Sequence, residues 1–273
     1  MNGNGAVISI ITVSYNAVKT IEQTIYSVVN QTYTDIEYII IDGGSTDGTV
    51  DIIKKYSDRI SRWVSEDDDG IYHAMNKGLA LATGEYVFFL GADDTLLSIN
   101  TINDVVGDLE QAHADIYSYS VYMVHEATGM EKQVDNVKCF LGKSIPVMVP
   151  HQGLFIKTAL AKKYCFDTEY KVAADYKLFL QCYFSQNVKF FYKNIPVAYF
   201  ATGGLSSSQT YMLTCENEAI LNELGLKHGK SRYFIKLFLA KLNVLNILKK
   251  IRDNTGCFRH ICRNEKCRWC GRF

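Results

Sequence analysis

The sequence lacks the long apolar runs that a membrane-spanning helix needs. No apolar stretch reaches the roughly 18 residues typical of such a helix, so we expect none. The polar start, Met1–Gly5, does not have the pattern of a signal peptide, and the apolar run after it, Ala6–Val13, indicates a strand. Repeats and low-complexity tracts are also missing. With 48% hydrophobic and 21% charged residues, the composition is that of a globular chain and not of a disordered one.

Two common nucleotide-binding motifs are missing as well. The glycine-rich segment Ile39–Thr49 (IIIDGGSTDGT) has Thr49 after Gly48, where a P-loop has Lys. Its glycines do not fit the G-x-G-x-x-G spacing of a dinucleotide-binding turn either. An NTPase and a nicotinamide-dependent dehydrogenase therefore lose their main support.

The formal net charge of zero hides an asymmetry between the two ends of the chain. Residues 230–273 contain 12 basic and 2 acidic residues, a net charge of +10, which leaves about −10 for residues 1–229. We therefore divide the chain into a main domain, 1–229, and a basic extension, 230–273. A basic tail on an acidic body indicates contact with an anionic surface.

Part of this extension has the pattern of an amphipathic helix. Ser231–Arg252 carries one broad apolar face with lysines elsewhere. The face is formed by Phe234, Leu237, Phe238, Leu242, Leu245, Leu248 and Ile251. An aromatic-rich apolar face with basic flanks is typical of a helix that lies in a membrane interface. A helix packed on the main domain fits the same pattern, and both alternatives stay open.

The chain contains eight cysteines in two groups. Four are scattered through apolar context and are expected to pack as small hydrophobic residues in a reducing compartment: Cys139, Cys165, Cys182 and Cys215. The others follow in the tail: Cys257, Cys262, Cys267 and Cys270. The spacing of Cys267 and Cys270 fits a zinc pair, but the frame of all four is unusual, so zinc binding is left open.

Strands and helices alternate in the first part of the chain, which predicts an α/β fold with a mostly parallel sheet flanked by helices. Strands are expected at Ala6–Val13, Glu37–Ile41 and Tyr86–Leu90. Helices are expected at Thr20–Gln31, from a cap at Ser45 or Thr46 to Tyr56, and at His73–Ala82.

The rhythm changes after residue 94. We expect helices at Ile102–Ala112, Thr158–Tyr164 and Asp175–Ser185. Strands are expected at Ile116–Val124, His151–Ile156, Val188–Tyr192 and Val197–Phe200. The small, polar segment Ala201–Gln209 indicates a mobile loop, of which Gly203–Ser208 could close over a bound diphosphate.

Two adjacent carboxylates, Asp93 and Asp94, follow the expected strand Tyr86–Leu90 almost directly. Ligands of open α/β sheets bind beyond the carboxyl ends of the strands. Hard oxygen ligands at such a place suit Mg²⁺ or Mn²⁺ that bridges a diphosphate. A solvated turn is the structural alternative, because Asp is common after strands.

Five segments together resemble the family-2 glycosyltransferases of the GT-A fold, especially bacterial enzymes that build surface polysaccharides. They are ITVSYN (Ile11–Asn16), IIIDGGSTDGT (Ile39–Thr49), DDGIYHAMNKG (Asp68–Gly78), TGEYVFFLGADD (Thr83–Asp94) and AADYKLFLQ (Ala173–Gln181). The resemblance covers about the first 210 residues. The chain departs from the family at Gly91, where Asn is common, and at His73, where Asp is common.

The resemblance implies a nucleoside site and a metal site. Residues expected to bind the nucleotide are Tyr15, Asn16, Asp42, Asp68, Asn76 and Lys77. Asp94 is implied as the ligand of Mn²⁺ or Mg²⁺, and Asp93 as a contact of the ribose or the same metal. The metal would neutralise charge on the leaving nucleoside diphosphate.

The resemblance also implies a general base, Asp175, near the start of a helix. An inverting transferase needs a carboxylate that takes the proton of the acceptor hydroxyl as this attacks the anomeric carbon. A favourable first-turn acid is the structural alternative for this residue. His151 and Gln152 resemble a pair found in a subgroup of polysaccharide enzymes. They are candidate contacts for the donor sugar, the acceptor or the metal.

These implications define the expected function. The enzyme would move a sugar from a nucleotide-sugar, a UDP-sugar in the first place, to a lipid-linked or oligosaccharide acceptor, with inversion and with a divalent metal. It would work in the cytoplasm, peripheral on the inner face of the cell membrane, with no nucleic-acid partner. Hexosyl and N-acetylhexosaminyl transfer in the synthesis of surface polysaccharides such as O-antigen both fit.

Two other classes remain as alternatives. A nucleotidyltransferase would have a Gly-rich, Arg-containing phosphate loop after the first strand, where this chain has SYNAVKT (Ser14–Thr20). A non-catalytic domain that docks on a membrane or nucleic acid through its basic tail would have no use for Asp42, Asp94 and Asp175.

Overall fold

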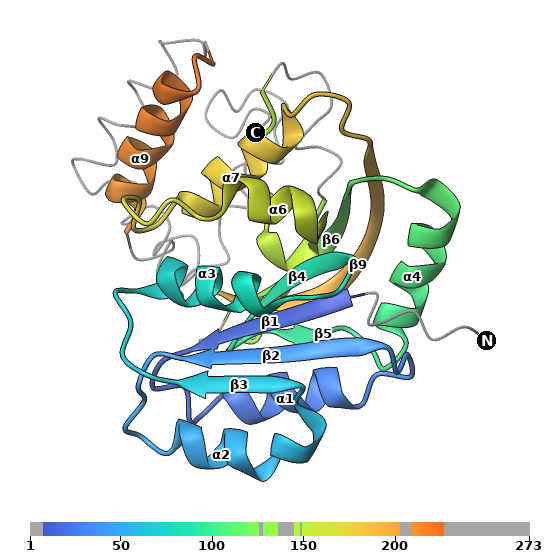
Figure 1. The fold of residues 1–273 in the computed structure, drawn as a ribbon, viewed down its shortest axis with the longest axis vertical. Coiled ribbons are helices and arrows are strands. Elements are labelled where there is room, and N and C mark those ends of the chain that lie inside the picture. The colour runs from blue at the N-terminus through green and yellow to red at the C-terminus, as the bar shows by residue number, and fades with distance from the viewer. Residues whose placement is uncertain (1–7, 126–127, 136–144, 148, 203–208, 227–273) are drawn as a thin grey trace. The chain divides into compact units, whose positions relative to one another are not determined.

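The computed structural model describes residues 8–125, 128–135, 145–147, 149–202 and 209–226 (Figure 1). The chain divides into two compact units, Met1–Gly204 and Leu205–Phe273. In the second unit the structure describes one helix, α9 (Thr210–Glu223). The predicted boundary after residue 229, the basic extension with its four cysteines, and the predicted loop Gly203–Ser208 lie outside the described residues.

The first half of the sheet is parallel, as predicted. Four strands are adjacent in the order β3-β2-β1-β4 and all point the same way. Their bounds are β1 (Ile8–Ser14), β2 (Ile36–Asp42), β3 (Arg62–Ser65) and β4 (Tyr86–Gly91). Side chains of β1, β2 and β4 are buried on both faces, which explains their near-continuous apolar sequences.

Helices cover both faces of these strands (Figure 1). Helices α1 (Ile21–Val29) and α2 (Thr49–Lys55) lie on one face, followed by the short 3-10 helix η1 (Ser57–Arg59). Helix α3 (Ile71–Leu81) lies on the other face, against β1 and β2. Because β3 runs parallel to β1 and β2, the loop that leads from β3 into α3 lies at the carboxyl ends of these strands.

The second half of the sheet is mixed, and the full strand order is β3-β2-β1-β4-β8-β6-β9-β5. Its strands are β5 (Thr95–Leu96), β6 (Ile116–His125), β8 (Leu154–Lys157) and β9 (Phe190–Thr202), with β7 (Glu131–Val134) paired to β6. β8 runs antiparallel to β4 and β6, whereas β9 runs parallel to β6. The helices are α4 (Thr101–Ala112), α6 (Thr158–Tyr164) and α7 (Ala174–Tyr183).

The structure corrects several predicted elements. The strand predicted at His151–Ile156 begins only at Leu154, because His151–Gly153 forms a 3-10 turn, η2, in which the Gly153 amide donates to the Pro150 carbonyl at 3.0 Å. The two strands predicted between residues 188 and 200 are one strand, β9, whose pairing with β6 shifts register around Pro196.

The second helix begins later than predicted, and three strands were not predicted. α2 begins at Thr49 after Gly48, whose φ of 101° is left-handed, whereas the predicted cap Ser45 turns its side chain to Asp42. The missed strands β3, β5 and β7 are two to four residues long. Such short strands carry too few residues to show a period of two.

Gly78 determines how closely α3 packs on the sheet. A Cβ atom at this position would lie 2.5 Å from Cγ2 of Ile11 on β1 and 3.4 Å from Cγ1 of Ile41 on β2. Both contacted side chains are buried, so neither has room to move aside. The absence of a side chain at residue 78 therefore allows α3 to pack at a short distance from β1 and β2.

We predict that Gly78→Ala lowers the free energy of unfolding by about 1 to 3 kcal/mol, the usual cost of overpacking a core. Urea unfolding followed by circular dichroism measures it. Gly107→Ala is the matched control, because a Cβ in the middle of α4 meets no atom within 4 Å. Helix propensity should make that variant more stable by roughly 0.5 to 1 kcal/mol. Equal effects of the two substitutions would show that α3 does not lie this close to the sheet.

Candidate active site

The ends of β1 and β2 form the first part of the site. Ser14 and Asp42 are paired at the carboxyl ends of these strands. Asp42 is completely buried, and four donors bind its carboxylate. These are the hydroxyls of Ser14 (2.9 Å), Ser45 (2.5 Å) and Ser65 (2.7 Å) and the backbone amide of Ser45 (2.9 Å).

This environment keeps Asp42 ionised. Burial acts to raise its pKa, but the hydrogen bonds from Ser45, Ser65 and Ser14 outweigh burial, and the pKa lies below the ordinary value. Both carboxylate oxygens have two donors, so Asp42 can contact a nucleobase directly only by exchanging one of them. Its observed contacts fix the turn after β2, while its predicted nucleotide contact stays a prediction.

The other predicted nucleoside residues surround this turn. Tyr15 follows β1 and has 69% of its surface exposed. Asn16 has a left-handed φ of 48°, and its side-chain oxygen accepts from the Thr46 amide at 3.0 Å. Asp68 caps the Gly70 amide at 2.9 Å. The structure thus brings an exposed aromatic ring close to a polar turn that carries Asp42.

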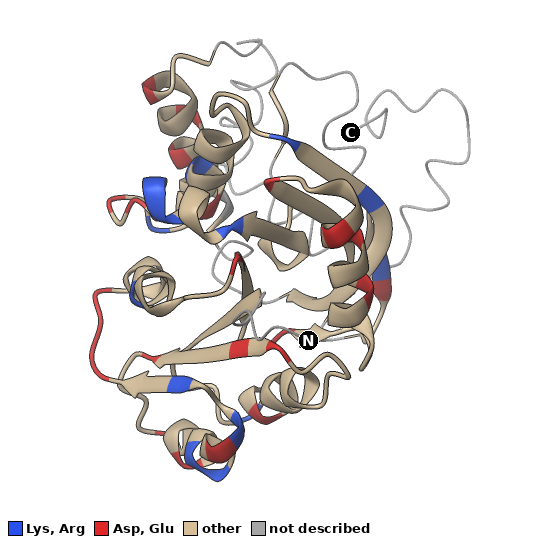
Figure 2. Ribbon diagram, turned by 45° about the vertical axis from the view of Figure 1, so that its right-hand side comes forward, with Lys and Arg blue, Asp and Glu red and all other residues tan. Residues whose placement is uncertain are grey.

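Asp68 lies beside the same turn. A Cβ at Gly43 would approach its Oδ2 to 3.0 Å, so the carboxylate packs directly on the backbone that follows β2. Figure 2 shows the acidic colour of the loop between β3 and α3, which carries Glu66 to Asp69. Asp68 therefore lies beside the turn that follows Asp42, and its predicted role in nucleoside binding stays a prediction.

Lys77 and Asn76 make other contacts. Lys77 Nζ lies 2.8 Å from Glu66 Oε1 and 3.3 Å from the Asp67 carbonyl. The Asn76 side chain donates to the carbonyl of Phe166 and accepts from its amide, each at 2.8 Å. These contacts join α3 to its neighbours, and the predicted role of both residues in nucleotide binding stays a prediction.

The acidic pair follows β4, and its two members differ in burial. Asp93 is exposed, whereas Asp94 is 2% exposed. Asp94 Oδ2 accepts from the side chain of Gln152 (2.7 Å) and the amide of Gly91 (3.2 Å), and its Oδ1 accepts from the amide of Ala201 (3.1 Å). Burial, and then the charge of Asp93, raise the pKa of Asp94 from 3.8 to about 6.

The donor set fits a hard divalent cation. Asp93 presents an exposed carboxylate, and Oδ1 of Asp94 has one protein donor and keeps a second lone pair. The described residues contain no group of three or more His, Cys, Asp or Glu side chains arranged for a metal. Such a cation would therefore complete its coordination with diphosphate oxygens and water, as Mg²⁺ commonly does.

Asp175 and the acidic pair both lie near His151. Asp175 Oδ2 is 3.4 Å from His151 Nδ1, and its Oδ1 accepts from the hydroxyl of Tyr72 at 3.2 Å. Burial acts to lower the pKa of His151, but the carboxylates of Asp175, Asp94 and Asp93 outweigh it and hold that pKa above the ordinary value.

The structure therefore joins five predicted residues into one cluster: Asp93, Asp94, His151, Gln152 and Asp175. Sequence reasoning missed the Tyr72 hydroxyl and the Ala201 amide, which complete it. Tyr72 lies inside the motif Asp68–Gly78, and that position could have marked it as a candidate site residue. Ala201 contributes a backbone amide, and no sequence pattern marks a backbone group as part of a site.

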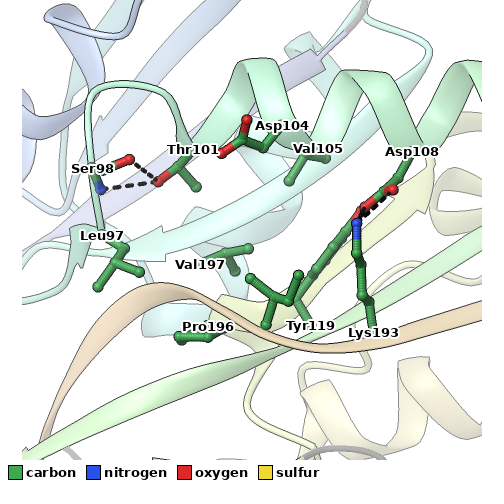
Figure 3. A pocket seen from close by; sticks show the side chains of 11 residues that line it. Leu97, Ser98, Thr101, Asp104, Val105, Asp108, Tyr119, Lys193, Pro196 and Val197 are labelled. Atoms are coloured by element: carbon green, nitrogen blue, oxygen red, sulfur yellow. Dashed lines mark hydrogen bonds and ion pairs between the residues drawn. The ribbon is translucent and has the colours of Figure 1, made fainter.

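A separate cavity of about 300 Å³ lies between α4, β6 and β9 (Figure 3). Lys193 Nζ binds both oxygens of Asp108 there, at 2.9 and 3.0 Å, and the Tyr119 hydroxyl donates to Asp108 at 3.0 Å. The predicted site residues are not among those that line it. The cavity therefore takes no part in the cluster around Asp94.

Comparison with known proteins shows the family of the chain. Residues 9–174 match the model of glycosyl transferase family 2. The chain belongs to this family. It is 30% identical over 206 residues to a PGL/p-HBAD biosynthesis glycosyltransferase of Mycobacterium tuberculosis, an alignment that covers 73% of this chain and 79% of the relative. This glycosyltransferase is thus of the type that the sequence motifs predict.

Other relatives support the family and the fold. A putative teichuronic acid biosynthesis glycosyltransferase of Bacillus subtilis is 36% identical over 128 residues, 46% of this chain and 51% of that protein. The crystal structure of S. aureus TarS in complex with UDP matches with a TM-score of 0.65 at 22% identity, covering 84% of this chain and 69% of that one. The predicted GT-A fold is therefore confirmed.

A more distant structure adds a metal-bound example. The mannosyltransferase from Pyrobaculum calidifontis, in complex with GDP-Man and Mn²⁺, matches with a TM-score of 0.61 at 17% identity, covering 88% of this chain and 70% of that one. At this identity the likeness concerns the fold alone. No helix among the described residues of the glycosyltransferase is both long and apolar enough to cross a membrane.

We predict that the metal-free enzyme loses stability as the pH rises from about 4 to about 7. The pKa of Asp94 is about 6 in the folded protein and 3.8 ordinarily, so folding favours its protonated form. That contribution is fully present below the ordinary pKa and is lost as the pH rises through the folded one. Asp94→Asn should flatten this part of the curve in urea unfolding by about 1 to 3 kcal/mol.

The control for this measurement is Asp51→Asn, whose side chain is 85% exposed on α2. It should keep the wild-type pH dependence because its carboxylate is solvated in both states. If Asp94→Asn loses stability with pH as steeply as wild type does, Asp94 is not the group that titrates.

Proposed function

We propose that this glycosyltransferase moves a sugar from a UDP-sugar to a hydroxyl of a lipid-linked or oligosaccharide acceptor, with inversion at the anomeric carbon. The observation that carries the proposal is the arrangement of two carboxylate positions around His151. Asp175 Oδ2 is 3.4 Å from the imidazole, and the charges of Asp94 and Asp93 act on the same ring. A metal site and a base near one side chain suit a leaving group and an acceptor that react at the same sugar carbon.

The nucleoside would bind at the ends of β1 and β2. Tyr15 offers an exposed ring for stacking on the base, and the turn with Asp42, together with Asp68, offers polar contacts. The diphosphate would then lie toward β4, where the acidic pair follows the strand. UDP bound to TarS, which shares the fold, supports the choice of nucleotide.

Asp93 and Asp94 are the residues that would hold Mn²⁺ or Mg²⁺. The cation, when bound, supplies positive charge that stabilises the leaving diphosphate. The Gln152 amide and the Ala201 backbone amide hold the Asp94 carboxylate in place. They leave Asp93 and one lone pair of Asp94 to face the ligand. Mn²⁺ in the related mannosyltransferase structure supports a divalent metal.

Asp175 would act as the general base. As the acceptor oxygen forms its bond to the anomeric carbon, its proton passes to Asp175, and the bond from that carbon to the diphosphate oxygen breaks. His151, whose Nδ1 lies 3.4 Å from Asp175 Oδ2, would contact the sugar near the base. The relatives named for PGL/p-HBAD and teichuronic acid biosynthesis support a glycan or lipid-linked acceptor.

A panel of nucleotide-sugars tests the proposal. Release of nucleoside diphosphate is measured with UDP-glucose, UDP-galactose, UDP-N-acetylglucosamine, UDP-glucuronic acid and GDP-mannose, each with Mn²⁺, with Mg²⁺ and with excess chelator. Metal-dependent hydrolysis of one or more UDP-sugars is the expected result. Hydrolysis that is confined to GDP-mannose, or that chelator leaves unchanged, would contradict the proposed donor or the proposed metal.

We predict that Asp175→Asn lowers kcat for donor hydrolysis on the order of 10² to 10⁴-fold, as expected when a general base is lost. The dissociation constant for UDP, measured by calorimetry, should stay the same because the nucleoside end of the site is untouched. Asp51→Asn, whose side chain is 85% exposed on α2, is the control and should keep the wild-type kcat. A wild-type kcat in Asp175→Asn, or a loss confined to UDP affinity, would exclude Asp175 as the base.

We further propose that the basic extension anchors the enzyme to anionic membrane, on the cytoplasmic side, and predict the result of removing it. A chain that ends at Lys230 should still hydrolyse donor but no longer co-sediment with phosphatidylglycerol vesicles. Each basic residue near such a surface contributes about 1 kcal/mol, and the removed segment, residues 231–273, contains 11 basic and 2 acidic residues, a net charge of +9. Full-length enzyme should be released only in part at high salt, because the apolar face remains bound. An insoluble or inactive shortened chain would favour a helix packed on the catalytic domain.

A further inference from the structure

The two oxygens of the Asp175 carboxylate have different surroundings. Oδ1 accepts from the hydroxyl of Tyr72 at 3.2 Å and from the backbone amide of Tyr176 at 2.8 Å. Oδ2 lies 3.4 Å from His151 Nδ1. A carboxylate oxygen has two lone pairs, so Oδ1 is filled by these two donors. Oδ2 is the oxygen with room to accept a proton.

Tyr72 itself is held rigidly. The residue is 8% exposed, and its ring stacks on that of Phe166 with centroids 5.6 Å apart and planes at 20°. Phe166 packs edge-on against Phe89 of β4, at 5.0 Å and 86°. Stacked and edge-to-face pairs of this kind fix ring positions in a close-packed interior. The hydroxyl of Tyr72 therefore has a defined place relative to the sheet.

Phe166 is in turn fixed through its backbone. The side-chain amide of Asn76 binds both the carbonyl and the amide of Phe166, each at 2.8 Å. Asn76 lies four residues after Tyr72 on α3, so both side chains project from the same face of that helix. One face of α3 thus contacts the segment around Phe166, which leads into α7. From the same face, the Tyr72 hydroxyl donates to the carboxylate of Asp175 on α7.

We propose that Tyr72 is a positioning residue for the base, and that Asn76 acts with it through Phe166. Tyr72 occupies Oδ1 of Asp175 and so aims Oδ2 at the acceptor hydroxyl. Asn76 keeps Phe166 under the Tyr72 ring and serves catalysis without touching the nucleotide. This inference rests on the proposed role of Asp175 and extends it to two residues of α3.

The first test is Tyr72→Phe, which removes the hydroxyl and keeps the ring stack. In hydrolysis of the UDP-sugar identified by the panel, kcat should fall about tenfold, since a misaligned proton acceptor is less efficient. The KM for the donor and the calorimetric affinity for UDP should not change. Tyr86→Phe is the matched control. It removes a buried hydroxyl that donates to the Ala114 carbonyl at 2.7 Å, at the other end of β4, and should keep the wild-type kcat.

The same substitution in an Asp175→Asn background separates this inference from the proposed function. If Tyr72 acts through Asp175, the double variant should have the kcat of Asp175→Asn alone. A further tenfold loss in the double variant, or a wild-type kcat in Tyr72→Phe while Asp175→Asn is impaired, would overturn the positioning role alone. A wild-type kcat in Asp175→Asn would instead overturn the proposed base.

Asn76→Ala distinguishes positioning from nucleotide binding at that residue. If Asn76 is a positioning residue, Asn76→Ala should lower kcat and leave the dissociation constant for UDP unchanged. Asn76→Asp keeps the acceptor for the Phe166 amide, so its kcat should lie between those of Asn76→Ala and wild type. A weakened UDP affinity with a normal kcat in Asn76→Ala would return Asn76 to the nucleotide site and remove it from the chain of contacts that ends at Asp175.

Discussion

The buried carboxylate of Asp94 joins three segments that come from distant parts of the chain. Its donors are the amide of Gly91 at the end of β4, the side chain of Gln152 in η2 and the amide of Ala201 near the end of β9. Its own carbonyl accepts from the hydroxyl of Thr24 on α1 at 2.7 Å. A buried carboxylate without such donors would cost several kcal/mol, so these contacts are needed for the fold as well as for the site.

This constraint determines where the proposed catalytic groups lie. Gln152 must reach Asp94, which brings its neighbour His151 near Asp175. The turn η2, which replaces the first residues of the predicted strand, allows these consecutive side chains to make different contacts. Even the absence of a side chain at Gly91 matters, because a Cβ there would approach Asp94 Oδ2 to 2.6 Å.

The site is thus built from two parts with different physical character. The proposed nucleoside end rests on parallel strands whose carboxyl ends coincide, and its polar contacts run between β1, β2 and β3. The proposed catalytic end depends on the mixed half of the sheet and on α7. Helix α3 links them, since Gly78 lets it lie close on β1 and β2 while Tyr72 and Asn76 reach toward the segment before α7.

The parts that follow local patterns could be predicted from the sequence. The apolar runs of β1, β2 and β4 located the strand ends, and the strand-end argument singled out the pair Asp93–Asp94, because ligands bind at such ends. The alternation of strands and helices predicted the α/β class, whereas the GT-A fold and the role of Asp42 were implied by the family resemblance.

The contacts that join distant segments could not be predicted in this way. Tyr72 and Asp175 are separated by 103 residues, and nothing in either segment shows that one donates to the other. Asn76 looked like a nucleotide ligand in its motif, yet its side chain binds the Phe166 backbone. The turn at His151 was mistaken for a strand because a tertiary contact, the hydrogen bond of Gln152 to Asp94, competes with local strand propensity.

We propose that Asp94 couples a divalent metal to the nucleotide. Calorimetric titration of UDP into the wild-type enzyme and into Asp94→Asn, each with Mn²⁺ and with excess chelator, tests this role. Mn²⁺ should raise the affinity of wild type for UDP and leave that of the variant unchanged. Both proteins should bind UDP equally in chelator, because the residues around Asp42 are intact in both. An equal gain in affinity from Mn²⁺ in wild type and variant would show that Asp94 does not hold the metal.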